Sequence, residues 1–369
     1  MSTDKPVRVA LLGCGAIAQA HLRAIAANPG VVEVAGIYDA DRSRAEARAT
    51  EFHVGHIYNT WHDVLAGNAD VIAVLLPHDL HAKFAVEVLE AGHHVVVEKP
   101  LEVTLARCDA LTAACAQAGV VLAGILPRRF GAGSQALKAA IVAGRFGQIT
   151  LAGALIPWWR TQAYYDSAAW RGTFALDGGG ALMNQGIHTI DLLLWFLGPV
   201  KRVSATAGLV AHEGIEVEDI ATGWIEFANG ARATLAGSTA CWSGTGFPAE
   251  IRIHGTAGSA VLRDDKLTAF EFAVPVASDN QQLAPATEGA GAGANDPKAI
   301  GHAWHRLNLE DAIAAIRAKG RPSVDGAEGR KAVELILALY ASAQNGGTPV
   351  DLPLKEDPVL RALSTKKKV

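Results

Sequence analysis

The stretch from Val7 to Ala18 limits the possible folds of this chain more than any other part of the sequence. Val7 to Leu12 is an unbroken apolar run, which is typical of a parallel strand covered on both faces. The hexapeptide Gly13-Cys14-Gly15-Ala16-Ile17-Ala18 follows directly and leads into a predicted helix that ends near Ala27. Between a strand and a helix, this G-x-G-x-x-A pattern allows a tight turn, close approach of a pyrophosphate and close helix packing. The sequence therefore predicts a dinucleotide site that includes Gly13, Gly15, Ala16 and Ile17.

Asp39 indicates which dinucleotide this site takes. It ends the predicted strand Val31 to Tyr38, about twenty residues past the loop, where its carboxylate can accept a hydrogen bond from a ribose 2′-hydroxyl. A 2′-phosphate would be repelled by that carboxylate, which favours NAD as the cofactor. Arg42 and Arg44 follow so closely along the chain that NADP stays possible.

The alternation of strands and helices continues to Leu126. Strands are predicted at 70–76, 94–97 and 120–126, and helices at 80–91 and 105–118, the second of them capped by Thr104. This alternation predicts an α/β fold with a doubly wound parallel sheet, in which ligands bind beyond the carboxyl ends of the strands. The residues at such ends, which we expect to meet at one crevice, are Gly13, Asp39, Pro77 and Lys99.

The pattern changes after Pro127 and predicts a second domain of the α+β class. A helix at 134–143 and a strand at 149–157 precede strands of alternating polarity, with hairpins around Asn229-Gly230 and between 251–253 and 260–262. The alternation predicts a mostly antiparallel sheet with one open face. A long loop is predicted at 278–300, followed by helices at 304–318 and 327–343. We therefore predict a dinucleotide-binding domain at 1–126 and a second domain at 127–369.

The segment from Asp177 to Asp191, DGGGALMNQGIHTID, begins with a glycine turn and continues as a predicted helix to about Leu197. An apolar stripe at helical spacing consists of Met183, Ile187, Ile190 and Leu194. A neighbouring polar stripe consists of Asn184, His188 and Asp191. A helix that buries one face and presents an amide, an imidazole and a carboxylate suits the wall of a reaction site. The same side chains can also be satisfied structurally inside a core.

The composition excludes several classes of protein. The chain has 369 residues, 50% of them hydrophobic, and a net charge of −4, so it offers no basic field for nucleic acid or an anionic membrane. The four cysteines have neither metal nor redox spacing, and the N-terminus enters a strand without an apolar leader, so we expect a cytoplasmic protein. Histidine pairs such as His78 and His81 lack further ligands in the sequence, so no metal site is predicted.

Four blocks along the chain resemble the Gfo/Idh/MocA oxidoreductases, the family of glucose–fructose oxidoreductase and inositol dehydrogenase. The blocks are GCGAIA, LPHDLH with AGHHVVVEKP, GGGALMNQGIHTID, and DAIAAIRAKGRPSVDGAEGRKAVELI, and they span nearly the whole chain. The resemblance implies an N-terminal Rossmann domain, a nicotinamide cofactor, and a C-terminal α+β domain whose open sheet packs against another subunit of a homodimer or homotetramer. It also implies that the substrate is a sugar, sugar acid, nucleotide sugar or cyclitol.

The resemblance also implies roles for individual residues. Lys99 matches the family's catalytic lysine, followed by a cis proline at Pro100, and His188 matches its catalytic histidine. Cofactor contacts are further implied at Pro77, His81, Glu98, Lys99, Trp170 and Arg171. Inositol dehydrogenases have aspartate where this chain has Asn184, and position 78, often asparagine, is His78. The chain more closely resembles the branch of nucleotide-sugar-acid dehydrogenases, which can work with the lysine and histidine alone.

These residue types suit the oxidation of a secondary alcohol. A neutral imidazole at His188 can accept the hydroxyl proton, while Lys99 can bind the reacting oxygen and stabilise the developing alkoxide. The reverse assignment, with Lys99 as the base, stays open. Asn184 can bind substrate hydroxyls, and Asp191 can fix the imidazole. Arg160, Tyr164 and Arg171 suit a sugar that carries carboxylate, sulfonate or phosphate, although they can also pair locally.

The leading hypothesis is an NAD- or NADP-dependent dehydrogenase or reductase that acts on a carbohydrate-like alcohol or ketone. One alternative is an NAD-dependent glycosidase or lyase, which oxidises a sugar carbon transiently and shares every residue named above. A second alternative is a non-catalytic regulator that senses the dinucleotide, against which the intact Lys99 and His188 count.

Overall fold

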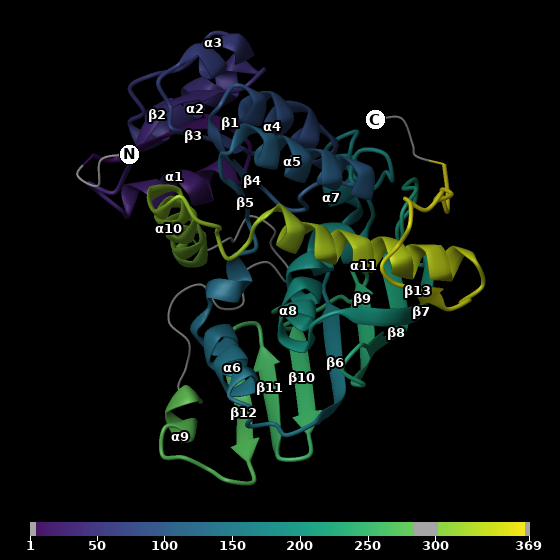
Figure 1. Ribbon diagram of the computed structural model, residues 1–369. Coiled ribbons are helices and arrows are strands. Elements are labelled where there is room, and N and C mark those ends of the chain that lie inside the picture. Colours follow the sequence, from purple (N-terminus) through teal and green to yellow (C-terminus); the bar gives the residue numbers. More distant parts are fainter. Residues whose placement is uncertain (1–4, 284–301, 366–369) are drawn as a thin grey trace. The chain divides into compact units, whose positions relative to one another are not determined.

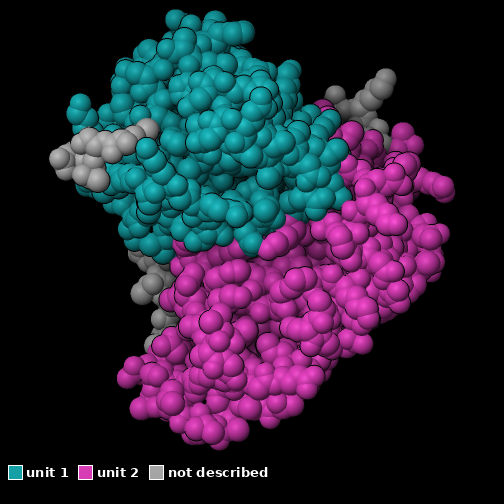
Figure 2. All heavy atoms as spheres, viewed as in Figure 1, with its two compact units in different colours: residues 1–127, 300–330 teal, residues 128–299, 331–369 magenta. Residues whose placement is uncertain are grey.

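The computed structural model describes residues 5–283 and 302–365. The chain divides into two compact units, residues 1–127 with 300–330 and residues 128–299 with 331–369 (Figure 2). No helix among the described residues is long and apolar enough to cross a membrane.

The first unit contains a five-stranded parallel sheet in the order β2-β1-β3-β4-β5 (Figure 1). Its elements are β1 (Val7–Leu12), α1 (Ala18–Ala26), β2 (Val32–Tyr38), α2 (Arg42–Phe52), α3 (Trp61–Ala66), β3 (Val71–Val74), a 3₁₀ turn (His78–Leu80), α4 (His81–Glu90), β4 (His94–Val97), α5 (Leu105–Ala118), β5 (Leu122–Gly124) and α10 (Ala303–Ala318). The bounds of β1, β4 and α5 agree with the prediction. The Thr104 hydroxyl caps α5 by accepting from the Arg107 N–H.

The helix α10 belongs to the first unit, although the predicted boundary after residue 126 assigns it to the second. Its apolar side chains Leu309, Ile313 and Ile316 belong to the same buried core as Val9 and Leu11 of β1. Figure 1 shows α10 beside α1, although the two helices lie far apart in the sequence. The helix predicted at 304–318 therefore completes the first unit instead of closing the second, because its apolar face packs on α1.

The second unit is built on an eight-stranded sheet in the order β12-β11-β10-β6-β9-β8-β7-β13. Its elements are α6 (Ala132–Val142), β6 (Ile149–Pro157), α7 (Gln162–Asp166), a π-helix (Ala181–Gly186), α8 (Ile187–Leu197), β7 (Val200–Gly208), β8 (Ile220–Phe227), β9 (Arg232–Ser238), β10 (Glu250–Gly255), β11 (Gly258–Arg263), β12 (Lys266–Phe272), α9 (Asp279–Gln282) and β13 (Val350–Asp351). The helix α11 (Gly326–Gln344) begins in the first unit and continues in the second.

The sheet of the second unit is mostly antiparallel, as predicted, and both predicted hairpins are present. The strands β8 and β9 pair across Asn229-Gly230, and β10 pairs with β11. Only the β6–β9 pairing is parallel among the described strands of this sheet. The helices α6 and α8 pack on one face, and Leu151, Leu155 and Trp224 remain exposed on strands β6 and β8. Of the loop predicted at 278–300, α9 is described and residues 284–300 lie outside the described residues.

Candidate active site

The turn after β1 passes so close to the end of β3 that only glycine fits. Gly13 has φ of 107°, and a Cβ there would lie 2.5 Å from the carbonyl oxygen of Leu75. The Gly13 N–H donates to the carbonyl oxygen of Tyr38 at the end of β2. This contact fixes the loop at the point where the strand order reverses between β1 and β3, which is where ligands bind in such sheets.

The loop and Asp39 fit a dinucleotide with an unmodified ribose. A Cβ at Gly15 would meet nothing within 4 Å, so the backbone there leaves room for a pyrophosphate. The Asp39 carboxylate accepts from the N–H groups of Cys14 (2.8 Å) and Asp41 (2.9 Å), which hold it at the loop. Each oxygen keeps a second lone pair for a ribose hydroxyl.

The two arginines that left NADP possible have other partners. Arg42 donates to Glu46, Asn59 and the carbonyl oxygen of Tyr58, and Arg44 pairs with Asp41 at 3.2 Å. Both guanidinium groups are therefore already engaged with acceptors on or near α2, which supports NAD over NADP.

Lys99 is the most accessible residue of an otherwise buried run. Between Val95 and Val103 all residues except Lys99 are buried, and Lys99 is partly exposed. The peptide bond between Lys99 and Pro100 is cis, as the family resemblance implies. Pro77, predicted at the same crevice, lies half-buried after β3 in the same unit.

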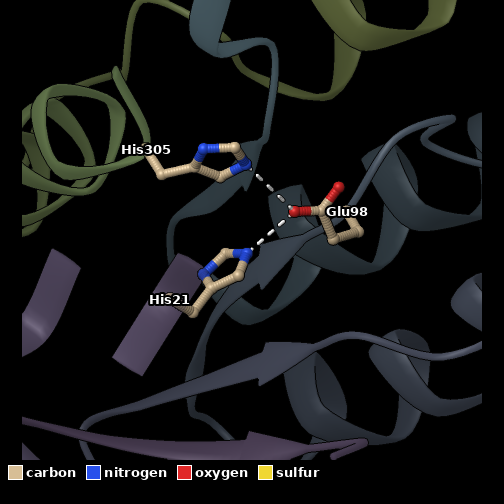
Figure 3. Close-up of side chains that lie close together, drawn as sticks. All are labelled: His21, Glu98 and His305. Atoms are coloured by element: carbon tan, nitrogen blue, oxygen red, sulfur yellow. Dashed lines mark hydrogen bonds and ion pairs between the residues drawn. The ribbon is translucent and has the colours of Figure 1, made fainter. Parts of the chain in front are cut away.

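Two predicted cofactor residues have buried side chains that hold the backbone near Lys99. The His81 ring lies between the carbonyl oxygens of Pro100 (2.8 Å) and Leu76 (2.9 Å), and burial lowers its pKa to about 4. The Glu98 carboxylate accepts from His21 at 2.8 Å and from the Lys99 N–H at 3.0 Å (Figure 3). Both side chains support Lys99 from within the unit, so a cofactor contact at these positions stays a prediction.

In the second unit, Asn184 and His188 are the accessible residues of a buried helix. From Ala181 to Leu194 all other residues are buried, including the predicted apolar stripe. The segment begins as a π-helix (Ala181–Gly186) and continues as α8, a difference from the regular helix predicted. Single π-turns are frequent at functional sites. Two of the three side chains of the predicted polar stripe are thus accessible together, whereas the third, Asp191, is buried.

Glu218, which sequence reasoning missed, holds the start of this helix. Its carboxylate accepts from the N–H groups of Gly180 (3.0 Å) and Leu182 (2.9 Å) and from the Tyr340 hydroxyl (2.8 Å). A Cβ at Gly180 would overlap the Glu218 carbonyl oxygen, which explains the third glycine of the turn. Burial raises the pKa of Glu218 to about 7, while these hydrogen bonds oppose the increase.

Asp177 and Asp191 each have a partner in the same unit that the sequence did not predict. The Asp177 carboxylate accepts from the Asn184 amide and from the Gly172 N–H, both at 2.8 Å, and so fixes the orientation of Asn184. Asp191 forms a buried two-pronged ion pair with Arg129, with N···O distances of 2.6 and 2.8 Å. Asp191 therefore takes part in an ion pair within the core, and its proposed support of His188 stays a prediction.

Arg160, Tyr164 and Arg171 lie together in the second unit, joined by Gln185. The Tyr164 hydroxyl accepts from Arg171 at 2.6 Å and from the Gln185 amide at 2.8 Å, and Gln185 in turn accepts from Arg160 at 2.6 Å. Arg160 is buried, whereas Arg171 is partly exposed. The guanidinium carbon of Arg171 lies 4.3 Å from the ring centre of Tyr164 and 4.5 Å from that of Trp170. Within 5–283 and 302–365, no carboxylate forms an ion pair with Arg171.

Three contributors to this site, Gln185, Asp177 and Glu218, were not predicted. Gln185 and Asp177 lie inside the segment that the sequence singled out, so their nearness to Asn184 was the available signal. Glu218 is far away in the sequence and gave no local signal, because it reaches the helix only through the tertiary fold.

A pair of glycine substitutions separates the structural role of the loop from its binding role. We expect Gly13→Ala to destabilise the protein, because its Cβ would meet the Leu75 backbone. Gly15→Val should leave the melting temperature nearly unchanged and weaken NADH binding by about tenfold or more, because its side chain would occupy the space left for a pyrophosphate. Calorimetry and NADH fluorescence titration measure the two effects.

Gly55→Val is the matched control for this pair, because a Cβ at that exposed glycine also meets nothing within 4 Å. It should change neither melting temperature nor affinity. Unchanged NADH affinity in Gly15→Val would contradict the position of the site.

Glu98→Gln should change how stability depends on pH. Burial alone would raise the pKa of Glu98, but the His21 hydrogen bond and the nearby His21, His305 and Lys99 charges lower it from 4.5 to about 2. The ionised carboxylate therefore stabilises the folded state above about pH 4.5, and this stabilisation is lost as the pH falls toward about 2. The shift corresponds to roughly 3 kcal/mol of unfolding free energy at neutral pH.

We expect calorimetry to show a lower melting temperature for Glu98→Gln at pH 7 and a smaller difference from the wild type at pH 3. Glu90→Gln, at the exposed end of α4, serves as the control and should match the wild type at both values. A deficit that stays the same at pH 3 would contradict the role of the charge.

The two units match two known domain families. Residues 7–124 match the oxidoreductase family with an NAD-binding Rossmann fold, and residues 134–261 match the GFO/IDH/MocA C-terminal domain. Two curated relatives span nearly the whole chain. D-glucoside 3-dehydrogenase of Escherichia coli (strain K12) is 28% identical over 95% of this chain and 99% of its own length. The 1,5-anhydro-D-fructose reductase of Ensifer adhaerens is 30% identical over 92% of this chain and 97% of its own.

A solved structure is similar over the same span. The WlbA dehydrogenase from Bordetella pertussis, in complex with NADH and UDP-GlcNAcA, aligns with a TM-score of 0.84 and 32% identity, covering 95% of this chain and all of that one. The sequence motifs, the fold of each unit and these similarities agree. The chain belongs to the Gfo/Idh/MocA family of oxidoreductases and takes NAD as its cofactor.

Proposed function

We propose that this protein is an NAD-dependent dehydrogenase that oxidises a secondary hydroxyl of a carbohydrate bearing an acid group. His188 and Lys99 are the proposed catalytic residues, and Asn184, Tyr164, Arg160 and Arg171 the proposed substrate-binding residues. The observation that carries the substrate class is the environment of Arg171: it is partly exposed, stacked between two aromatic rings and not paired with a carboxylate among the described residues.

The surroundings of Arg171 favour the binding of an anion. Its planar guanidinium can form two parallel hydrogen bonds to a carboxylate, and the rings and the Tyr164 hydroxyl restrict its orientation before the substrate arrives. Asp177 links this region to the helix, because it accepts from the Gly172 N–H, next to Arg171, and from Asn184. The acid group and the sugar hydroxyls would therefore be bound by neighbouring parts of one unit.

The chemistry assigned to each residue follows from its side chain. When bound, NAD⁺ supplies the acceptor for the hydride from the carbon of the alcohol. His188 accepts the hydroxyl proton through its imidazole, and the Lys99 amine donates a hydrogen bond to the oxygen that becomes the ketone. Asn184 is uncharged and holds a neighbouring hydroxyl. Asparagine stands at this position where inositol dehydrogenases have aspartate.

The relatives support this class of substrate. One acts on glucosides and another on 1,5-anhydro-D-fructose by name, and the WlbA dehydrogenase binds UDP-GlcNAcA, which is both a nucleotide sugar and a sugar acid. The acid-bearing sugar of that complex agrees with what the surroundings of Arg171 favour. The glycosidase or lyase alternative uses the same residues, and the regulator alternative predicts binding without turnover.

We also propose a homodimer or homotetramer formed through the open sheet face, in the cytoplasm. On this face Leu151 and Leu155 of β6 are 52% and 47% exposed and Trp224 of β8 is 40% exposed. Gly153 of β6, Thr234 of β9 and Trp224 form one row across the sheet, so Leu151, Leu155 and Trp224 lie on the same face of it. Contiguous apolar patches of this kind are typical of subunit interfaces.

An absorbance screen tests the function. Protein and NAD⁺ would be mixed with pairs of neutral and acidic sugars, with nucleotide sugars and their uronic acids, and with nitrophenyl glycosides, while NADH and nitrophenolate are followed together. We expect NADH to form with an acidic sugar and at least tenfold faster than with its neutral partner. Nitrophenolate without NADH would identify the glycosidase alternative, and NADH binding without any turnover would favour the regulator.

Lys99→Ala should abolish turnover of the substrate found in this screen and leave NADH binding within about threefold of the wild type. The reason is that the amine acts on the reacting oxygen, where loss of one preorganised donor costs about 10²–10³ in rate. Lys83→Ala, an exposed lysine of α4 in the same unit, is the control and should retain activity. Near-normal turnover in Lys99→Ala would exclude the catalytic assignment.

Trp224→Glu should separate the subunits. A carboxylate at this position of the open face would be buried without a partner in the assembly, which costs several kcal/mol. Light scattering coupled to size exclusion measures the mass. Val142→Glu, at a 75% exposed position of α6, is the control and should keep the wild-type mass. An unchanged oligomer in Trp224→Glu would place the interface elsewhere.

A further inference from the structure

Three side chains from distant parts of the first unit meet inside it. His21 comes from α1, Glu98 follows β4, and His305 comes from α10. All three are buried, with exposed fractions of 3%, 5% and 6%. Figure 3 shows both imidazoles pointing at the same oxygen of Glu98, while the other oxygen points away from them. A buried carboxylate without such partners would be strongly disfavoured.

Both oxygens of Glu98 are engaged, and one of them reaches the proposed catalytic lysine. Oε1 lies 2.8 Å from Nε2 of His21 and 3.8 Å from Nε2 of His305. Oε2 accepts from the backbone N–H of Lys99 at 3.0 Å. The carboxylate therefore ties the Lys99 backbone to α1 through a hydrogen bond and faces α10 through a longer electrostatic contact.

The charge of Glu98 acts on the Lys99 amine as well as on its backbone. Glu98 stays ionised although it is buried, and its pKa of about 2 reflects His21, His305 and Lys99 as the cationic or donating groups around it. His81 of α4 is the further titratable group that interacts with it. Because the interaction is mutual, the carboxylate favours the protonated form of Lys99. It opposes the loss of charge that a neighbouring nicotinamide cation would promote.

We propose that Glu98 is a positioning residue for Lys99. The Glu98 carboxylate is held by a hydrogen bond from His21 and by the longer contact with His305, and it fixes the lysine backbone and keeps the amine charged. Only the expected effect of Glu98 on turnover rests on the proposed function of Lys99, since the contacts and the ionisation of Lys99 do not depend on a substrate. This role of Glu98 links the helix α10 to the reaction, because His305 of that helix is one of the two histidines that hold the Glu98 carboxylate.

A metal ion is the other arrangement that these three side chains allow. Their ligand atoms lie within 4.8 Å of one another, and two imidazoles with a carboxylate are a known zinc ligand set. Adjacent ligands of a tetrahedral zinc ion are about 3.3 Å apart, given bonds of about 2.0 Å. The 2.8 Å separation of His21 and Glu98 is instead a hydrogen-bond distance. The geometry thus favours the hydrogen-bonded cluster, and the metal becomes an outcome of the test.

The first experiment measures the ionisation of Lys99 and needs no substrate. The lysines would be reductively methylated with ¹³C-formaldehyde, and the Lys99 signal identified by its loss in Lys99→Arg. A pH titration by NMR then follows that signal. We expect Glu98→Gln, which keeps the shape and removes the charge, to lower the Lys99 titration midpoint by about one unit or more.

Glu102→Gln is the matched control. Glu102 is also buried and lies in the same segment, but its carboxylate accepts from the N–H groups of Ala82 and Val103 instead of that of Lys99. It should leave the Lys99 midpoint within about 0.3 unit. The same small change in Glu98→Gln would overturn the proposal, whatever the substrate proves to be.

Substitutions of the two histidines test the same proposal if Glu98→Gln fails to fold. We expect His21→Ala to lower kcat on the substrate from the screen more than His305→Ala does, because only His21 lies at hydrogen-bond distance from the Glu98 carboxylate and so holds it in place. With the substrate from the screen, Glu98→Gln should lower kcat about tenfold or more and change KM less than threefold, since a misplaced amine weakens the transition state more than binding. A loss confined to KM would overturn the positioning role.

Metal analysis closes the test. The purified wild-type protein would be incubated with zinc sulfate, dialysed and assayed by mass spectrometry for bound metal. We expect less than about 0.1 zinc per chain above the level of His21→Ala. One zinc per chain that depends on His21, Glu98 and His305 would replace the hydrogen-bonded cluster with a metal centre.

Discussion

The contact between Gly13 and the end of β3 is the constraint on which the first unit depends. The backbone of the loop lies against the Leu75 carbonyl, where a side chain has no room. The same loop receives the Asp39 carboxylate and begins α1, which carries His21 toward Glu98. A single close approach of backbone to backbone thus sets both the dinucleotide loop and the helix that supports Lys99.

Buried carboxylates organise the rest of the proposed site. Glu98 fixes the backbone of Lys99, Glu218 holds the first turn of the helix that carries His188, and Asp177 orients Asn184. Each accepts hydrogen bonds from two or more groups in different parts of its unit. A buried acceptor of this kind is costly to leave unpaired and so defines one arrangement of the segments that it joins.

The second unit separates two tasks on its sheet. One face is covered by α6 and α8, and the other presents Leu151, Leu155 and Trp224. The π-helix and α8 are buried so largely that Asn184 of the first and His188 of the second are left accessible for chemistry. The hydrophobic packing of these two helices therefore selects which side chains can meet a substrate, and the aromatic rings around Arg171 prepare an anion site in the same unit.

The sequence by itself determined the parts of this protein that rest on local pattern. The apolar runs and the turn signals predicted β1, β4 and α5 to the residue and the Asn229-Gly230 hairpin, and helical spacing predicted the polar stripe of which Asn184 and His188 are partly exposed. The tertiary structure alone decided the contacts between distant segments: α10 in the first core, Glu218 at the helix start, and the ion pair of Asp191 with Arg129. Periodicity reports which face of an element is buried, because burial repeats with the element's own geometry. It does not report which distant side chain that face will meet, because that choice is made only when the elements pack.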